Sequence, residues 1–245
     1  MGILDRGRHD KNALKDARSA LERAGDAPED DGVLGRQVLK VVEGLLDLGI
    51  DGKGTFAPAA KVADDALRSA GGDVDAAIDA VIRSHTIKAG AEGFVTSLGG
   101  FVTLPVSLPA NVIAFYALAT RMTAAIARLR GHDIAQPQVR TAVLLSLAGA
   151  DADDLLRKAG RAVPTGGITN LVAQRLPGPA EMVVKKAVGF RVIATAGKGT
   201  FARFGRAVPV LGGAVGAGVD VWMLRSIAQN ARKEFPPADR LVGPA

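Results

Sequence analysis

Histidine is the residue type with the most scope for chemistry in this sequence, which has three histidines and no cysteine. His9 lies near the start and His132 follows a glycine, whereas His85 lies on a predicted helix just before a glycine-rich run. The ring of His85 could hydrogen-bond a headgroup phosphate, act as a base, or be a satisfied, half-buried residue of that helix. No H-E-x-x-H motif or other metal-ligand spacing occurs, and the lack of cysteine excludes a thiolate nucleophile. The sequence predicts no catalytic residue, no metal and no cofactor, and leaves His85 as the candidate polar site.

The pentapeptide GKGTF occurs twice, at 52–56 and 197–201, and alanine follows each copy. A P-loop needs serine or threonine after its lysine, and glycine stands there in both copies. The repeat matches the G-x-G-x-x-A dinucleotide fingerprint, but no alternation of strands and helices surrounds it. We therefore predict that both copies form turns between helices. Because no G-x-S-x-G motif occurs either, enzymatic activity has no support in the sequence.

Positive charge is concentrated in the last third of the chain, whose overall net charge is +6. From Arg175 onward there are eleven Lys and Arg against four Asp and Glu. Phenylalanines alternate with these cations, as on surfaces that dock to anionic membranes, although a solvated basic face with core phenylalanines fits equally well. Aromatic residues make up 4% and no DNA- or RNA-recognition motif occurs, so nucleic acid is disfavoured as a partner. The predicted lipid- or membrane-binding residues are Lys185, Lys186, Arg191, Lys198, Arg203, Arg206, Phe201 and Phe204.

An uncharged stretch over 93–120 is long enough to cross a bilayer. Pro105 and Pro109 interrupt it, and proline inside a helix costs about 3 kcal/mol. We predict a helical hairpin here, buried in protein or dipping into a bilayer, rather than an ordinary transmembrane helix. The glycine-rich stretch 212–218 predicts a second closely packed element, and the two could wall an apolar pocket or groove. The residues predicted for this hairpin or pocket are Phe94, Leu98, Phe101, Leu104, Phe115, Gly212 and Gly216.

Helical periodicity is common along the chain and convincing strands are scarce. An apolar stripe runs from Leu34 to Leu46, with Gly49 as its predicted C-cap. Asp73 is the predicted N-cap of a later helix. The sequence predicts an all-α fold, a single multi-helix domain of roughly nine to eleven helices with close, glycine-rich helix packing. We expect residues 1–33 to form an N-terminal appendage and linker, and 34–245 to form the domain. Further helices are predicted over 11–24, 57–70, 73–92, 109–130, 137–148, 151–160 and 211–235.

Two segments together resemble the EcsC family of bacterial proteins. HTIKAGAEGFVTSLGGFVTLPVSLPANVIAFYALATRMTAAIARLRGHD, residues 85–133, is similar to the family's central segment, and VPVLGGAVGAGVDVWMLRSIAQNARKEF, residues 208–235, is similar to its closing motif. Asp220 stands where the family usually has asparagine. The resemblance covers roughly 76–235 and implies a helical domain without established catalytic residues. The matching positions are His85, Ala89, Gly93, Thr96, Gly99, Gly100, Pro105, Pro109, Gly131, Asp133, Pro209, Gly212, Gly213, Gly216, Asp220, Ala228, Ala231 and Phe235.

Three functional hypotheses follow from these patterns. The first is a non-enzymatic cytoplasmic protein that associates peripherally with anionic membranes, at the inner face of the cell membrane, or binds a lipid or apolar ligand between glycine-rich helices. The second is a soluble scaffold whose apolar stretches are all core and which acts through a protein partner. An enzyme using His85 is a third hypothesis. The first twelve residues lack an apolar signal region, and the chain lacks cysteine, so we expect a cytoplasmic location.

Overall fold

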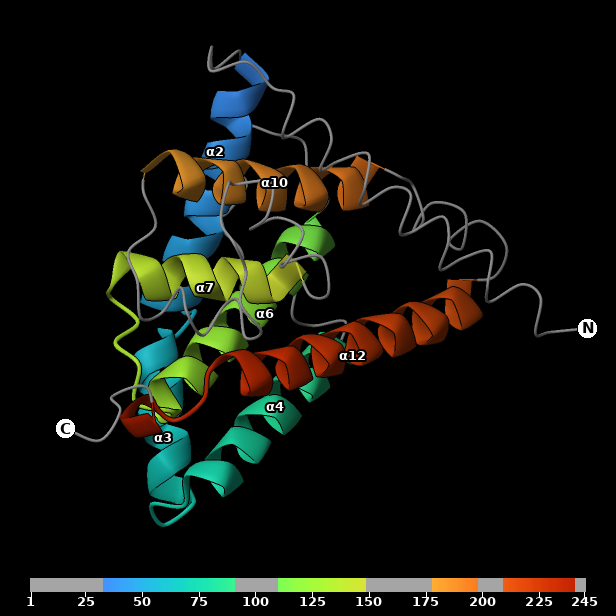
Figure 1. Ribbon diagram of the computed structural model, residues 1–245. Coiled ribbons are helices and arrows are strands. Elements are labelled where there is room, and N and C mark those ends of the chain that lie inside the picture. The colour runs from blue at the N-terminus through green and yellow to red at the C-terminus, as the bar shows by residue number, and fades with distance from the viewer. Residues whose placement is uncertain (1–32, 91–109, 149–177, 198–208, 241–245) are drawn as a thin grey trace, which may run out of the picture.

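The computed structural model describes residues 33–90, 110–148, 178–197 and 209–240, and regular structure within these ranges is helical (Figure 1). The predicted all-α class is confirmed. These ranges hold seven α-helices, so the predicted total of nine to eleven stays a prediction. The predicted helices over 11–24 and 151–160, and the appendage up to residue 32, lie outside the described residues. The elements are α2 (Val33–Leu46), the π-helical turn η1 (Asp47–Asp51), α3 (Ala59–Ser69), α4 (Val74–Gly90), α6 (Ala110–Leu129), α7 (Pro137–Ala148), α10 (Gly178–Gly197), α12 (Pro209–Glu234) and the 3-10 turn η3 (Ala238–Arg240).

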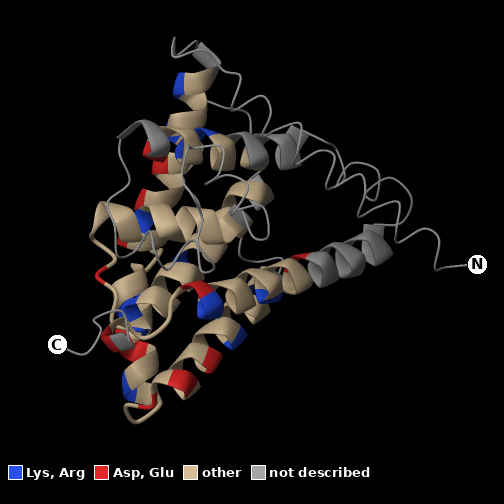
Figure 2. Ribbon diagram, in the orientation of Figure 1, with Lys and Arg blue, Asp and Glu red and all other residues tan. Residues whose placement is uncertain are grey.

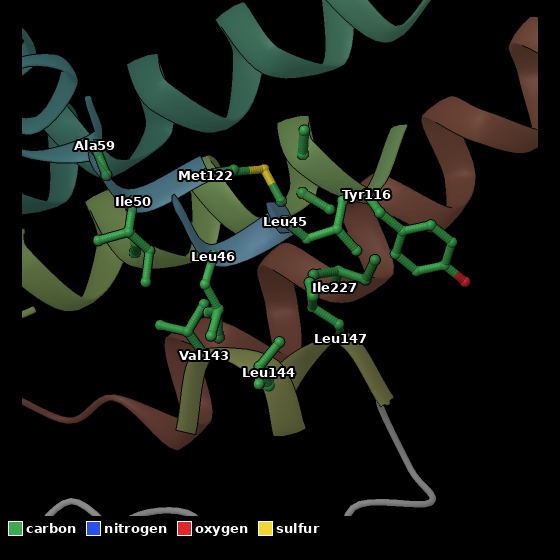
Figure 3. Close-up of a cluster of buried hydrophobic side chains, with 14 of the residues drawn as sticks. Leu45, Leu46, Ile50, Ala59, Tyr116, Met122, Val143, Leu144, Leu147 and Ile227 are labelled. Atoms are coloured by element: carbon green, nitrogen blue, oxygen red, sulfur yellow. The ribbon is translucent and has the colours of Figure 1, made fainter. Parts of the chain in front are cut away.

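Helix α6 forms the centre of the described fold. It packs against α2, α3, α4, α7, α10, α12 and η1. By length and hydropathy the stretch Val112–Leu129 could cross a membrane, and 89% of that stretch is buried inside the protein. Met122 and Tyr116 are buried, and Figure 3 shows Met122 beside Leu45 of α2 and the Tyr116 ring at the edge of the drawn cluster. The second half of the uncharged stretch is therefore a core helix in this structure, while residues 93–109 lie outside the described ranges.

Helices α4 and α12 lie side by side and run in opposite directions (Figure 1). Asp73 accepts a hydrogen bond from the Ala76 backbone N–H at 3.0 Å, so the predicted N-cap of α4 is confirmed. Arg232 of α12 forms an ion pair with Asp79 of α4. This pair marks residues of the two helices that lie opposite each other.

Gly49 is not the C-cap that the sequence predicts. The chain continues past it through η1, and the residue with a positive φ is Gly52, at +75°. Gly49 is buried against α6, where an added Cβ would lie 2.5 Å from the Cβ of Thr120. Gly189 of α10 makes an equally close approach to Val38 of α2. These two glycines are required by close helix packing, which local sequence does not reveal.

The first GKGTF copy forms a tight turn, as predicted. Lys53 and Phe56 exchange both backbone hydrogen bonds, each at 3.0 Å. Gly52 and Gly54 have φ of +75° and +59°, values that favour glycine. The turn places Phe56 in the core, at 6% exposure. In the second copy α10 ends at Gly197, and residues 198–201 lie outside the described ranges.

Candidate functional site

Three residues far apart in the sequence meet between α4, α6 and the 52–56 turn. The guanidinium carbon of Arg121 lies 3.8 Å from the centre of the Phe56 ring. The Nε–H of Arg121 donates a hydrogen bond to Nε2 of His85 at 3.1 Å. Arg121 is 4% exposed and His85 is 0% exposed. The fold therefore holds a cation inside the protein, with an aromatic face on one side and an imidazole at its edge.

The hydrogen bonds of His85 fix its tautomer and its charge. Nδ1 lies 2.8 Å from the carbonyl oxygen of Val81, so Nδ1 carries the proton and donates it. Nε2 is then the acceptor for Arg121. Burial, reinforced by the positive charge of Arg121, lowers the pKa of His85 to about 3. Both ring nitrogens of the neutral ring are occupied, so His85 orients Arg121 and does not serve as an available base.

Arg121 carries its charge without a carboxylate partner among the described residues. The ion pairs in those ranges are made by other cations, such as Arg128 with Asp64 and Arg140 with Asp51. Burial lowers the pKa of Arg121 to about 10, so it stays protonated at neutral pH. Buried charges in proteins are normally paired. A cation–π contact and a neutral imidazole stabilise this one instead.

Lys88 is a second cation on the same helix as His85. Lys88 follows His85 by one helical turn on α4 and is exposed. Burial of part of its side chain, with repulsion from Arg121, lowers the pKa of Lys88. The exposed Lys88 of α4 therefore lies within electrostatic range of the buried Arg121 of α6.

Large apolar side chains are exposed near the end of α4 and at the middle of α12. Ile87 is 66% exposed and Trp222 is 69% exposed. Counting from the Asp79–Arg232 pair, Ile87 is eight residues along α4 and Trp222 is ten residues back along α12. At about 1.5 Å per residue, both lie roughly 12–15 Å from that pair, in the same direction.

Basic residues flank these two apolar side chains. Arg83, Lys88 and Arg225 are exposed on the same two helices. Along α4, Asp75 and Asp79 lie in the first half and Arg83 and Lys88 in the second half, and Figure 2 shows the red and blue segments in this order. The two signs of charge are therefore separated along α4. We call the set Arg83, Ile87, Lys88, Trp222 and Arg225 the α4/α12 tip.

The described lysines of the predicted 185–206 surface lie on α10, which packs against α2 and α7. Lys185 pairs with Glu181 at 2.8 Å, and Lys186 is buried, at 9% exposure. Arg191 lies on the same helix, but its side chain is not described. The other predicted members of that surface lie outside the described ranges: Lys198, Phe201, Arg203, Phe204 and Arg206.

Among the residues predicted for the apolar hairpin or pocket, the structure describes the side-chain surroundings of Phe115 alone. Phe115 is partly buried against the core, and its ring meets Tyr116 edge to face, with centroids 5.4 Å apart. Gly212 and Gly216 lie in α12, in turns whose surroundings are not described. The pairing of the two apolar stretches stays a prediction. Phe94, Leu98, Phe101 and Leu104 lie outside the described residues.

The sequence that contains this site matches a protein-family model. The model of the EcsC protein family matches residues 72–236. The chain belongs to the EcsC family. No curated protein and no solved structure matches it. The EcsC segment contains α4, α6 and α12, and therefore His85, Arg121 and the whole α4/α12 tip, whereas Phe56 precedes it.

Sequence reasoning singled out His85 but missed the residues that the fold places around it. Arg121 had one usable signal, since it is the first charge after the uncharged stretch 93–120. A lone cation inside an apolar helix needs a partner or an opening to solvent. Trp222 had a weaker signal, as the chain's single tryptophan.

Proposed function

We propose that this EcsC-family protein associates peripherally with anionic membranes through the α4/α12 tip. The observation that carries the proposal is the exposure of Trp222 and Ile87 among Arg83, Lys88 and Arg225. Tryptophan favours the membrane interface, where its ring enters the apolar boundary and its N–H stays hydrated. Cations beside it meet anionic headgroups. A non-enzymatic role at the inner face of the cell membrane fits this arrangement.

The expected binding is reversible. Each tip cation contributes about 1 kcal/mol near an anionic surface, and burying a large apolar side chain contributes about 1.5–3 kcal/mol. These terms are offset by the cost of immobilising the protein at the membrane. The cationic part is screened by salt. Binding should therefore weaken as the salt concentration rises.

Close helix packing at glycine supports the other parts of the proposal. Gly49 and Gly189 each bring two helices together closely. We propose the same role for Gly212 and Gly216, in a fold of nine to eleven helices in all. Cations and phenylalanines over 198–206 are candidates to extend the membrane-binding surface.

The chain supplies its own reporter for the test. Trp222 is the single tryptophan, so its fluorescence reports on the tip alone. We expect its emission to move to shorter wavelength with vesicles of phosphatidylcholine and phosphatidylglycerol, and to stay unchanged with phosphatidylcholine alone. Flotation of the protein with the same vesicles measures the bound fraction.

A pair of charge-matched variants separates the tip from net charge. Arg83→Glu/Arg225→Glu changes two exposed tip cations, and Lys61→Glu/Arg68→Glu makes the same change on α3. We expect the first variant to lose flotation and the second to retain it. Equal loss in both would show that net charge alone drives binding. If the wild-type protein does not float with anionic vesicles, the proposal is wrong and the protein-scaffold alternative takes its place.

A further inference from the structure

We infer that Arg121 and Lys88 form a binding site for a phosphomonoester group, supplied by the headgroup of an anionic lipid beside the α4/α12 tip. The inference rests on the proposed membrane association, because it names the headgroup that the membrane would present. A free phosphate ester shares the same chemistry, and comparing vesicle binding with binding of a soluble phosphate ester distinguishes the two sources. The site lies at the end of α4, where His85, which accepts a hydrogen bond from Arg121, precedes the exposed Lys88 by three residues, about one helical turn.

The geometry of Arg121 is suited to an anion. A guanidinium has five N–H donors in one plane, and here Nε–H is taken by His85. Phe56 lies against one face of the group, 3.8 Å from the guanidinium carbon. The plane of the guanidinium is therefore held on two sides before any ligand arrives. The four N–H groups of its terminal nitrogens form the fork that recognises carboxylates and phosphates in two-pronged contacts.

The charges around Arg121 favour an added anion. Across the described residues, no Asp or Glu forms an ion pair with Arg121 or Lys88. By contrast, Arg128, Arg130 and Arg232 each pair with one aspartate and Arg140 pairs with two. Repulsion between Arg121 and Lys88 contributes to the lowered pKa of Lys88. An anion between the two cations would remove that repulsion and offset the burial of Arg121. Binding of an anion should therefore stabilise the fold.

Two cations select the kind of anion. A phosphodiester headgroup carries a single negative charge, whereas a phosphomonoester carries about 1.5 to 2 charges near neutral pH. The doubly charged group can accept from the guanidinium fork and from the ammonium of Lys88 at once. A carboxylate has one charge and two oxygens, and it matches the pair less well. The chemistry therefore favours a phosphomonoester lipid, such as phosphatidic acid, over phosphatidylglycerol.

The site lies beside the apolar side chains of the tip, as lipid phosphates lie beside the acyl layer of a membrane. Lys88 follows Ile87 directly in α4, and both side chains are exposed. A lipid phosphate lies at the boundary between water and the acyl layer, the depth at which a docked amphipathic surface places its cations. With Ile87 and Trp222 in the apolar boundary, Lys88 would be at the depth of the phosphates. Arg121 lies behind it, in the core.

The experiment compares vesicle binding and soluble phosphate binding with the full-length protein. Vesicles of phosphatidylcholine carry either phosphatidic acid or phosphatidylglycerol, adjusted to equal surface potential. In a parallel arm, glycerol 3-phosphate is titrated by calorimetry, with sodium sulfate at equal ionic strength as the control anion. The variant Lys88→Gln removes an exposed charge that no described residue pairs, so it is expected to fold. Arg121→Lys is the second variant, and its circular dichroism is checked first.

We expect wild-type protein to bind phosphatidic acid vesicles about tenfold more tightly than phosphatidylglycerol vesicles, the factor that a charge-assisted hydrogen bond supplies. Lys88→Gln and Arg121→Lys should lose this preference and still bind phosphatidylglycerol vesicles through Trp222 and Arg225. Equal binding of wild type to both vesicles overturns the phosphomonoester site and leaves the proposed function intact. Binding of glycerol 3-phosphate without binding to either vesicle overturns the lipid source and the proposed function together, and assigns the site to a soluble phosphate ester. Binding of neither overturns both proposals.

Discussion

Acid should destabilise this protein through one buried ring. The pKa of His85 is about 3 in the folded protein and about 6.5 in the unfolded chain, because burial disfavours the charged ring. Below pH 6.5 the unfolded chain therefore takes up a proton that the folded protein does not. The stabilisation from His85 is complete above pH 6.5 and is lost progressively as the pH falls toward 3.

The size of the effect follows from those two pKa values. Between pH 6.5 and pH 5, an interval of about 1.5 pH units, the His85 ring is protonated in the unfolded chain and neutral in the folded protein. Each pH unit of that interval lowers the free energy of unfolding by about 1.36 kcal/mol, so the total fall between pH 8 and pH 5 should be about 2 kcal/mol. For a domain of this size that corresponds to a fall in melting temperature of about 4–8 °C. Urea unfolding followed by circular dichroism at pH 8 and pH 5 measures the change directly.

A variant isolates His85 from other titrating groups. His132 also has a lowered pKa, mainly from burial, and adds to the acid sensitivity in the same direction. His85→Gln keeps an oxygen that can accept from Arg121 but removes the titration. The loss of stability between pH 8 and pH 5 should therefore be about 2 kcal/mol smaller in His85→Gln than in the wild type. Equal losses would refute a buried, neutral His85 and the placement of Arg121 that depends on it.

Three further substitutions test the packing around α6 and the tip. Gly49→Ala should destabilise the protein by about 1–3 kcal/mol, because the new Cβ meets Thr120, and urea unfolding will show whether it does. Phe56→Leu keeps an apolar side chain but removes the aromatic face under Arg121, so we expect the free energy of unfolding to fall by about 1–2 kcal/mol. In a double-mutant cycle with Arg121→Met, most of that fall should be found as interaction energy between the two residues. Trp222→Ser should change the unfolding free energy by less than about 0.5 kcal/mol and reduce flotation with anionic vesicles, since its side chain is exposed; a large loss of stability would place Trp222 in the core instead.

Local signals in the sequence predicted several helices closely. The predicted 137–148 matches α7 (Pro137–Ala148), and the predicted 109–130 differs from α6 by one residue at each end. Helix α4 starts one residue after the predicted N-cap, Asp73, because the cap is a local hydrogen bond. Capping residues, proline and glycine act over a few positions, so the sequence alone can show them.

Features set by contacts between helices were not predictable in this way. Glycine is the residue type expected at a helix end, but Gly49 is needed because its backbone lies against Thr120, which is far away in the sequence. Helix α10 has Pro179 in its first turn and mixes lysine with small apolar residues, so its periodicity gave no clear signal. His85 was identifiable by residue type alone. Its contact with Arg121, thirty-six residues later, is made by the packing of α4 on α6.

The burial of α6 has a consequence for how the protein is made. A newly synthesised stretch with the length and hydropathy of Val112–Leu129 meets the criteria by which membrane spans are selected. Most of the helices that bury α6 precede it in the chain, because α2, η1, α3 and α4 are complete before α6 is synthesised. Helix α7, which also packs against α6, begins after a connection of seven residues. The order of elements therefore lets α6 be covered by earlier helices as soon as it emerges. A circular permutant that begins at α6 would expose this helix before any of that cover exists, and we expect it to be misdirected to the membrane or to aggregate.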